Sequence, residues 1–302
     1  MPRHSVCNVV TTIAAVHLLS RRAFCALETF CSLSPGASCA RPFKAIYKRY
    51  LRHHYQDRAM RLLNIDTLDF QEFPGEPPPY AIASHRWAED EVTYKDVKKR
   101  RNQGMPGYQK IQDYCALVHR FNAKYGRYGH LSCEWIWIDT CCIDKGSSAE
   151  VQESINSMFT WYARAVVCFA YLADVKPLSA GKKRVMASFR KSVWFKRGWT
   201  LQELLAPQVV VFLTRDWDFV GHKCTDASYK YYFGGSVPEI DVGLGASLNK
   251  CVGDVTSIPL EVLSDYDNSR TWSVDARMSW TGRRSTTRVE DMSYCLLGIF
   301  GV

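Results

Sequence analysis

Four short apolar runs, separated by segments with helical periodicity, restrict the fold of this 302-residue chain more than any other feature. The runs are YAIAS (80–84), EWIWIDT (134–140), AVVCFAYLAD (165–174) and VVVFLTRDW (209–217). In the second run, Trp135 and Trp137 point to one face while Ile136 and Ile138 point to the other, as in a parallel strand covered on both sides. Strands that alternate with helices build an α/β fold. We therefore predict an open, mostly parallel sheet flanked by helices.

The segments between the runs carry helix signals. Residues 109–124 place Ile111, Cys115, Val118 and Phe121 on one side of a helix. Ser147 and Glu150 are spaced as a capping box, and Val151, Ile155, Met158, Phe159 and Tyr162 then recur at helical intervals. Thr287 and Glu290 form a second such pair, and the core stripe that it predicts contains Val289, Met292, Leu296 and Ile299. Residues 223–269 read as an irregular insertion with one short helix.

The first 59 residues differ from the rest of the chain. They carry nine Lys or Arg and two acidic residues, so seven of the nine net positive charges lie there and residues 60–302 carry a net of +2. We predict a basic N-terminal extension (1–59), either poorly ordered or a mitochondrial presequence, ahead of one globular domain (60–302). The apolar stretch of this extension, NVVTTIAAVHLL, is too short for a membrane span. Because the net charge of residues 60–302 is so close to zero, nucleic acid is not expected as a partner.

The twelve cysteines are spread along the chain with no CxxC pair and no repeated spacing, which is typical of reduced, buried thiols in a cytoplasmic protein. Cys133 and Cys141 lie on either side of a predicted strand, so they are too far apart to share a zinc ion, and we predict no metal. Cys142 could act as a nucleophile only if His85 reached it, and a buried thiol is the better interpretation.

Ligands of parallel sheets bind beyond the carboxyl ends of the strands. Ser84, His85, Arg86 and Trp87 follow the first run, and Asp139 and Asp144 follow the second. A third candidate segment is RGWTLQELLAP (197–207), which reads as a short helix. At about 100° per residue its leucines 201, 204 and 205 share one side, and Trp199, Gln202 and Glu203 share the other. We expect the leucines to face the core and Glu203 to face away from it, beside Trp199.

Five blocks of the sequence resemble, in order, those of the fungal heterokaryon incompatibility (HET) domain. They are RLLNIDTLDFQEF, PPYAIASHRWAEDEVTYKDV, WIWIDTCCIDKGSSAEVQESINSMFTWYARAVVCFAYLADV, FRKSVWFKRGWTLQELLAPQVVVFLTRDW and RMSWTGRRSTTRVEDMSYCLLGIFGV. The resemblance covers about residues 60–302, and the family pattern continues past the last block, so we expect the C-terminal edge of the domain to be truncated.

The resemblance implies a domain that triggers programmed cell death in self/non-self recognition between fungal cells. HET domains are remotely similar to Toll/interleukin-receptor (TIR) domains of innate immunity, which are flavodoxin-like, and some TIR domains are NADases that use a glutamate in a W-x-x-x-E-L segment. Trp199 to Leu204 resembles that segment. The resemblance thus makes Glu203 the catalytic candidate, and Ser84, His85, Arg86, Trp87, Asp139, Asp144, Arg197 and Trp199 candidates for binding substrate, with NAD as a substrate and no bound cofactor.

Three interpretations remain open at this point. One is an NAD glycohydrolase that is active when subunits assemble, and the second is a non-enzymatic death-signalling scaffold that acts through self-association and other cell-death proteins. The third is an inert product of a truncated gene. The first two differ in what they require of Glu203.

Overall fold

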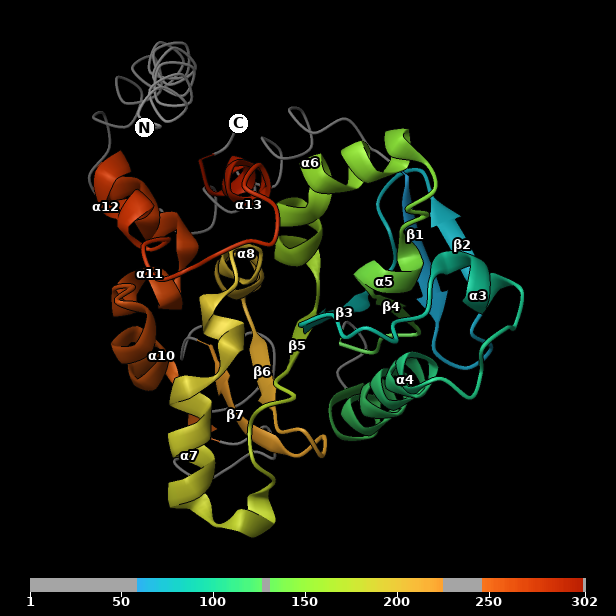
Figure 1. Cartoon of the computed structure of the whole chain (residues 1–302), viewed down its shortest axis with the longest axis horizontal. Coiled ribbons are helices and arrows are strands. Elements are labelled where there is room, and N and C mark those ends of the chain that lie inside the picture. Colours follow the sequence, from blue (N-terminus) through green and yellow to red (C-terminus); the bar gives the residue numbers. More distant parts are fainter. Residues whose placement is uncertain (1–58, 127–130, 225–245, 301–302) are drawn as a thin grey trace, which may run out of the picture.

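The computed structural model describes residues 59–126, 131–224 and 246–300 (Figure 1). The predicted basic extension lies outside these residues, apart from its last member, and the first strand, β1, begins at Met60. The strands are β1 (Met60–Asn64), β2 (Phe70–Phe73), β3 (Tyr80–His85), β4 (Trp135–Trp137), β5 (Val167–Tyr171), β6 (Val210–Leu213), β7 (Phe219–Lys223) and β8 (Ala246–Ser247).

The strands form one mixed sheet in the order β2-β1-β4-β3-β5-β6-β7-β8. Its centre, β4-β3-β5-β6, is parallel, whereas β1 and β7 run antiparallel to β4 and β6. Counted from β3, this parallel centre has the order 2-1-3-4, as in flavodoxin-like sheets. The α/β class with a mostly parallel sheet is confirmed. Each of the four apolar runs coincides with one of its parallel strands, and β3 continues one residue past its run, to His85.

Helices cover both faces of the sheet. The longer ones are α4 (Pro106–Tyr125), α6 (Ser148–Arg164), α7 (Lys182–Lys191), α10 (Asn249–Thr256) and α13 (Asp291–Phe300), and the short ones are α3 (Tyr94–Lys98), α5 (Asp139–Cys142), α8 (Thr200–Leu205), α11 (Leu260–Ser264) and α12 (Val274–Ser279). Short 3-10 helices are η2 (Leu178–Ala180), η3 (Val193–Lys196) and η4 (Tyr266–Thr271). Helix α4 contains the predicted helix, begins with a proline, and buries the predicted side.

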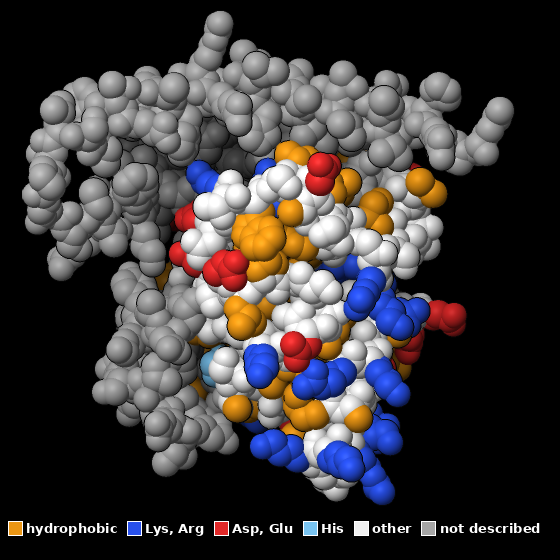
Figure 2. Space-filling model, turned by 90° about the vertical axis from the view of Figure 1, so that its left-hand side faces the viewer, with side chains coloured by type: hydrophobic (Ala, Val, Ile, Leu, Met, Phe, Trp, Pro, Cys, Tyr) orange, Lys and Arg blue, Asp and Glu red, His pale blue; other side chains and the backbone are white. Residues whose placement is uncertain are grey.

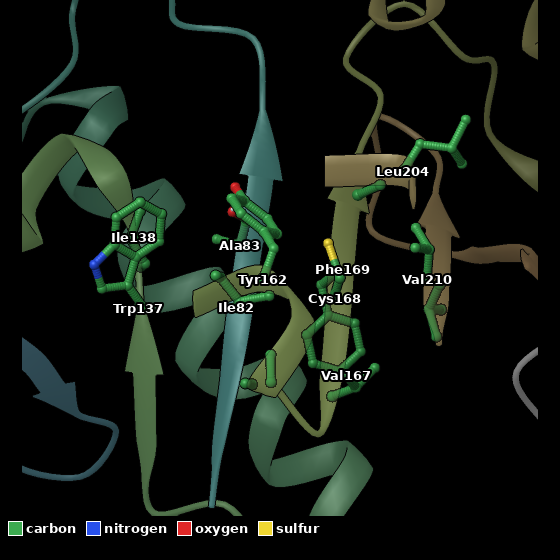
Figure 3. Close-up of a cluster of buried hydrophobic side chains, with 14 of the residues drawn as sticks. Ile82, Ala83, Trp137, Ile138, Tyr162, Val167, Cys168, Phe169, Leu204 and Val210 are labelled. Carbon is green, nitrogen blue, oxygen red and sulfur yellow. The ribbon is translucent and has the colours of Figure 1, made fainter. Parts of the chain in front are cut away.

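The alternation of side chains along each strand divides the core between the two faces. Phe169 of β5 contacts Phe121 of α4 on one face. On the other face Trp137 of β4 packs against Trp161 and Tyr162 of α6. Figure 3 shows the packing on this second face, where one side chain from each parallel strand meets Tyr162 of α6 and Leu204 of α8. The strand residues are Ile82, Trp137, Cys168 and Val210. The sheet is therefore buried on both sides, as the apolar runs predict.

Several expectations at helix starts and in the insertion were wrong. Ser147 accepts a hydrogen bond from the Glu150 backbone, but the Glu150 carboxylate binds Arg61 and the backbone nitrogen of Asp144 instead of completing the capping box. Val289 precedes α13 and is 89% exposed, so it is not a core residue. Residues 246–269, within the predicted insertion, hold β8 and the two helices α10 and α11 rather than one short helix.

The positive charges of the domain are unevenly placed. Helix α7 carries Lys182, Lys183, Arg184, Arg190 and Lys191, all exposed, and it has no acidic residue. Lys and Arg side chains gather in the lower part of the face in Figure 2. The near-neutral net charge of the domain therefore does not mean an even charge distribution.

No helix in the described part of the chain is both long and apolar enough to cross a membrane.

Candidate functional site

Strand β3 ends at the point where the strand order reverses, between β4 and β5, and its last two residues face opposite sides of the sheet. Ser84 lies opposite Ala170 of β5 and His85 opposite Tyr171. Because side chains alternate, Ser84 points to the face covered by α6 and α8, and His85 to the face covered by α4. In parallel sheets, the place where the strand order reverses is where ligands bind.

Ser84 connects the end of the strand to α8. Its hydroxyl donates a hydrogen bond to Oε2 of Glu203 and accepts one from Nε1 of Trp194 at 2.8 Å. Ser84, Trp194 and Glu203 are 1%, 1% and 7% exposed. A buried carboxyl group is thus held at the carboxyl end of the central parallel strand.

Helix α8 is buried on all sides, which the sequence did not predict. Leu201, Leu204 and Leu205 face the core as expected, but Gln202 and Glu203 are buried as well. The helix packs against η3, α6, α11 and α13, so no side of it faces solvent. The expectation that Glu203 faces away from the core was therefore wrong, and Glu203 is not a solvated surface charge.

Burial controls the ionisation of Glu203. Removal from water raises the pKa of its carboxyl group to about 8, and the negative charge of Asp139 adds to the rise. The hydrogen bond from Ser84 and the positive charges of Arg197 and Arg284 lower this pKa and offset part of the effect. At neutral pH the carboxyl group is mostly protonated, and a positive charge brought close to it would favour its ionised form.

A C-terminal segment holds the start of α8 in place. Arg284 donates hydrogen bonds from Nη1 to the carbonyl oxygen of Arg197 at 2.9 Å and to Oγ1 of Thr200 at 2.8 Å. The backbone nitrogen of Gly198 donates to Ser285, and that of Ser285 donates to Lys196. Burial lowers the pKa of Arg284 to about 10, so its guanidinium remains charged at neutral pH.

A second group of polar side chains lies on the other side of β3. His85 Nε2 is 3.5 Å from Oε1 of Glu91, and His85 Nδ1 is 4.0 Å from Oδ1 of Asp139. Glu91 also forms an ion pair with Lys110 of α4 and accepts a hydrogen bond from the backbone of Ala88 at 3.0 Å. Although burial opposes its charge, His85 and Lys110 lower the pKa of Glu91 to about 2.

Trp87 joins this group to the outer surface. Its Nε1 donates to Oδ2 of Asp139 at 2.7 Å, and the ammonium of Lys145 lies 3.4 Å from the centre of its ring. Trp87 is 43% exposed. Four of the residues that the sequence selected, Ser84, His85, Trp87 and Asp139, are thus linked through β3 and its following loop.

The remaining selected residues are Arg86, Asp144, Arg197 and Trp199. Arg197 and Trp199 are half-buried at the start of α8, and Arg86 is exposed. Asp144 accepts a hydrogen bond from the backbone of Gly146 at 2.9 Å in the turn before α6 and lies 3.9 Å from Lys95. Asp144 therefore contacts its own turn and α3.

Sequence reasoning missed Trp194, Glu91, Lys110 and Arg284. Trp194 lies five residues before Trp199 in the quoted block FRKSVWFKRGW, and only the fold shows that its ring nitrogen reaches Ser84. Glu91 and Lys110 are 19 residues apart, and no spacing rule connects them.

The described cysteines form no disulfide. All eight cysteines in the described ranges are free and buried, as the sequence predicted, and Cys142 contacts backbone atoms of Ile136 and Ile138. In the same ranges, no group of three or more His, Cys, Asp or Glu is arranged to hold a metal ion.

Comparison with known proteins identifies the class of domain. Residues 80–188 match the family model "Heterokaryon incompatibility protein (HET)", and these residues contain β3, β4, β5 and the polar groups around His85. The chain therefore carries a domain of the HET family.

A particular relative is similar over most of this chain. The vegetative incompatibility protein HET-E-1 of Podospora anserina is 42% identical over 233 residues, which is 76% of this chain. The matched region is 15% of the length of that protein. No solved structure matches the chain.

Proposed function

We propose that this chain acts in heterokaryon incompatibility, as a domain that triggers programmed cell death in self/non-self recognition, and that it does so by cleaving NAD between nicotinamide and ribose. The membership of the HET family supports the first part. The second part is supported by one observation, the buried Glu203 carboxyl group bound by Ser84 at the carboxyl end of β3.

The chemistry requires a single carboxylate. Nicotinamide departs from its positively charged linkage as a neutral molecule, so the leaving group needs no general acid. The remaining ribose cation is oxocarbenium-like and is stabilised by a nearby negative charge. In this proposal Glu203 supplies that charge, Ser84 orients its carboxylate, and Trp199 stacks on a ring of the substrate.

The raised pKa of Glu203 fits this role. The carboxyl group is mostly neutral in the free protein at neutral pH, and the cationic nicotinamide ring lowers its pKa when it binds. The negative charge therefore develops where substrate is present. Because Glu203 is 7% exposed, substrate reaches it only when neighbouring side chains move, which is consistent with activation by assembly.

The test measures nicotinamide released from NAD by the full chain at high concentration, with Glu203→Gln and the matched control Glu261→Gln. Glu261 is an exposed glutamate on α11, which packs against α8. We expect release by the wild type and the control, and a reduction of about 100-fold or more in Glu203→Gln. Equal release by all three would remove Glu203 from the mechanism.

Release by none of the three would favour the alternative, a non-enzymatic scaffold that signals through self-association. In that case the Ser84–Glu203 hydrogen bond only fixes α8 on the sheet. Light scattering of the same samples then decides whether the chain self-associates.

A further inference from the structure

His85 and Asp139 present buried polar atoms to each other without satisfying them. Nδ1 of His85 and Oδ1 of Asp139 are inaccessible to solvent and have no hydrogen-bonding partner in the described part of the chain. The His85 side chain is 1% exposed. Leaving such a group unsatisfied is costly, and native proteins place a water molecule or a ligand atom at such positions.

The distance between these groups has room for one oxygen atom. Nδ1 of His85 and Oδ1 of Asp139 are 4.0 Å apart, which is too far for a direct hydrogen bond. One oxygen can lie within hydrogen-bonding distance of both atoms. The other carboxylate oxygen of Asp139 already accepts the hydrogen bond from Trp87, so Oδ1 is the atom left to bind a hydroxyl.

Glu91 fixes which nitrogen of His85 accepts a proton. Two carboxylates flank the ring, and that of Glu91 is the nearer, with Oε1 3.5 Å from Nε2 against 4.0 Å between Nδ1 and Oδ1 of Asp139. In the neutral ring the hydrogen therefore lies on Nε2, and the lone pair of Nδ1 faces Asp139. Lys110 and the backbone of Ala88 hold Glu91 in place. The side chain that faces Asp139 is thus arranged as a base with a carboxylate behind it, as in catalytic histidines.

We propose that His85 and Asp139 bind the hydroxyl that attacks the substrate, water in the hydrolysis of NAD, and that His85 is its general base. This role rests on the proposed function. The C1′–N1 bond breaks and its electron pair leaves with neutral nicotinamide. The water oxygen bonds to C1′, and one water proton passes to Nδ1 of His85 and then to solvent. The products are ADP-ribose, nicotinamide and one proton.

A nucleophile without a proton to lose separates His85 from Glu203. Labelled nicotinamide that re-enters NAD attacks C1′ through its neutral ring nitrogen and needs no base. The experiment compares hydrolysis with this exchange in the full chain, in His85→Gln, in Asp139→Asn and in His119→Gln. His119 is an exposed histidine of α4 and serves as the control.

We expect hydrolysis by His85→Gln to fall about 100-fold while exchange falls less than about threefold, with a smaller loss in Asp139→Asn and none in His119→Gln. Equal loss of both reactions in His85→Gln would overturn the role of His85 and leave that of Glu203 intact. A wild type that performs neither reaction would overturn the proposed function and the role of His85 with it.

A measurement on the wild type avoids any effect of the substitution on folding. Nitrogen-15 NMR of labelled histidine distinguishes the two tautomers of a neutral imidazole. We expect the proton of His85 on Nε2, and a neutral ring with its proton on Nδ1 would overturn the assignment of Nδ1 as the base.

Discussion

Glu203 of α8 accepts a hydrogen bond from Ser84, the penultimate residue of β3, across 119 positions of sequence. This contact joins the helix to the carboxyl end of the central parallel strand. It also places an ionisable group where it is removed from water, and three measurable consequences follow.

Replacing Glu203 by glutamine changes how stability depends on pH. The pKa of this group is about 8 in the folded protein against a normal 4.5, so the unfolded chain ionises first and the free energy of unfolding falls between those pH values. From pH 5.5 to 8.5 the wild type loses about 3 kcal/mol through this group. We expect Glu203→Gln to lack that loss in urea titrations at the two pH values. An equal fall in both proteins would show that Glu203 has a normal pKa.

The rate of NAD cleavage depends on the same ionisation. Since the carboxylate form is the active one in the proposed mechanism, kcat/KM rises with pH, about tenfold per unit well below the pKa, and levels off above about 8. The pH profile of nicotinamide release by the full chain measures this. A rate that falls as pH rises would contradict the role of the ionised form.

Removing the hydroxyl of Ser84 leaves a buried donor without its acceptor. In Ser84→Ala, Nε1 of Trp194 loses the partner that it has at 2.8 Å, in a side chain that is 1% exposed. We expect a loss of about 1–3 kcal/mol in the free energy of unfolding. Ser179→Ala, at an exposed serine, is the control and should change stability by less than about 0.5 kcal/mol. Equal stability of the two variants would argue against the contact.

Gly298 is required where α13 crosses α6. A Cβ atom at this position would lie 2.1 Å from Cβ of Phe159, which is fixed to the backbone of α6 and cannot move aside alone. We expect Gly298→Ala to destabilise the domain by about 1–3 kcal/mol in thermal or urea unfolding. Gly104→Ala has no atom within 4 Å of the added carbon and is the matched control. A neutral Gly298→Ala would show that the two helices are farther apart.

The sequence determined the central strands because their signals are local. Apolar runs on both faces predict buried parallel strands, and β3 to β6 coincide with the four runs to within one residue. The start of α6 was only half predictable. The S-x-x-E spacing marks where the helix begins, but the carboxylate of Glu150 pairs with Arg61, which is 89 residues away in sequence.

The selection of Ser84, His85 and Asp139 also came from the sequence, because the carboxyl ends of parallel strands meet at one edge. The environment of Glu203 could not be predicted from the sequence. Helical periodicity gives the side of α8 on which a residue lies, but not what packs against that side. The tertiary structure surrounds α8 with η3, α6, α11 and α13, and so buries its polar side as well.

The sequence by itself thus determined the four central strands, their parallel arrangement and the edge at which polar residues gather, since these follow from patterns within a few residues. Only the tertiary structure decided that Trp194 and Ser84 hold Glu203 out of water, and that Glu91 and Lys110 stand behind His85. Those contacts join residues far apart in the chain, and their energies depend on burial, which no local pattern encodes.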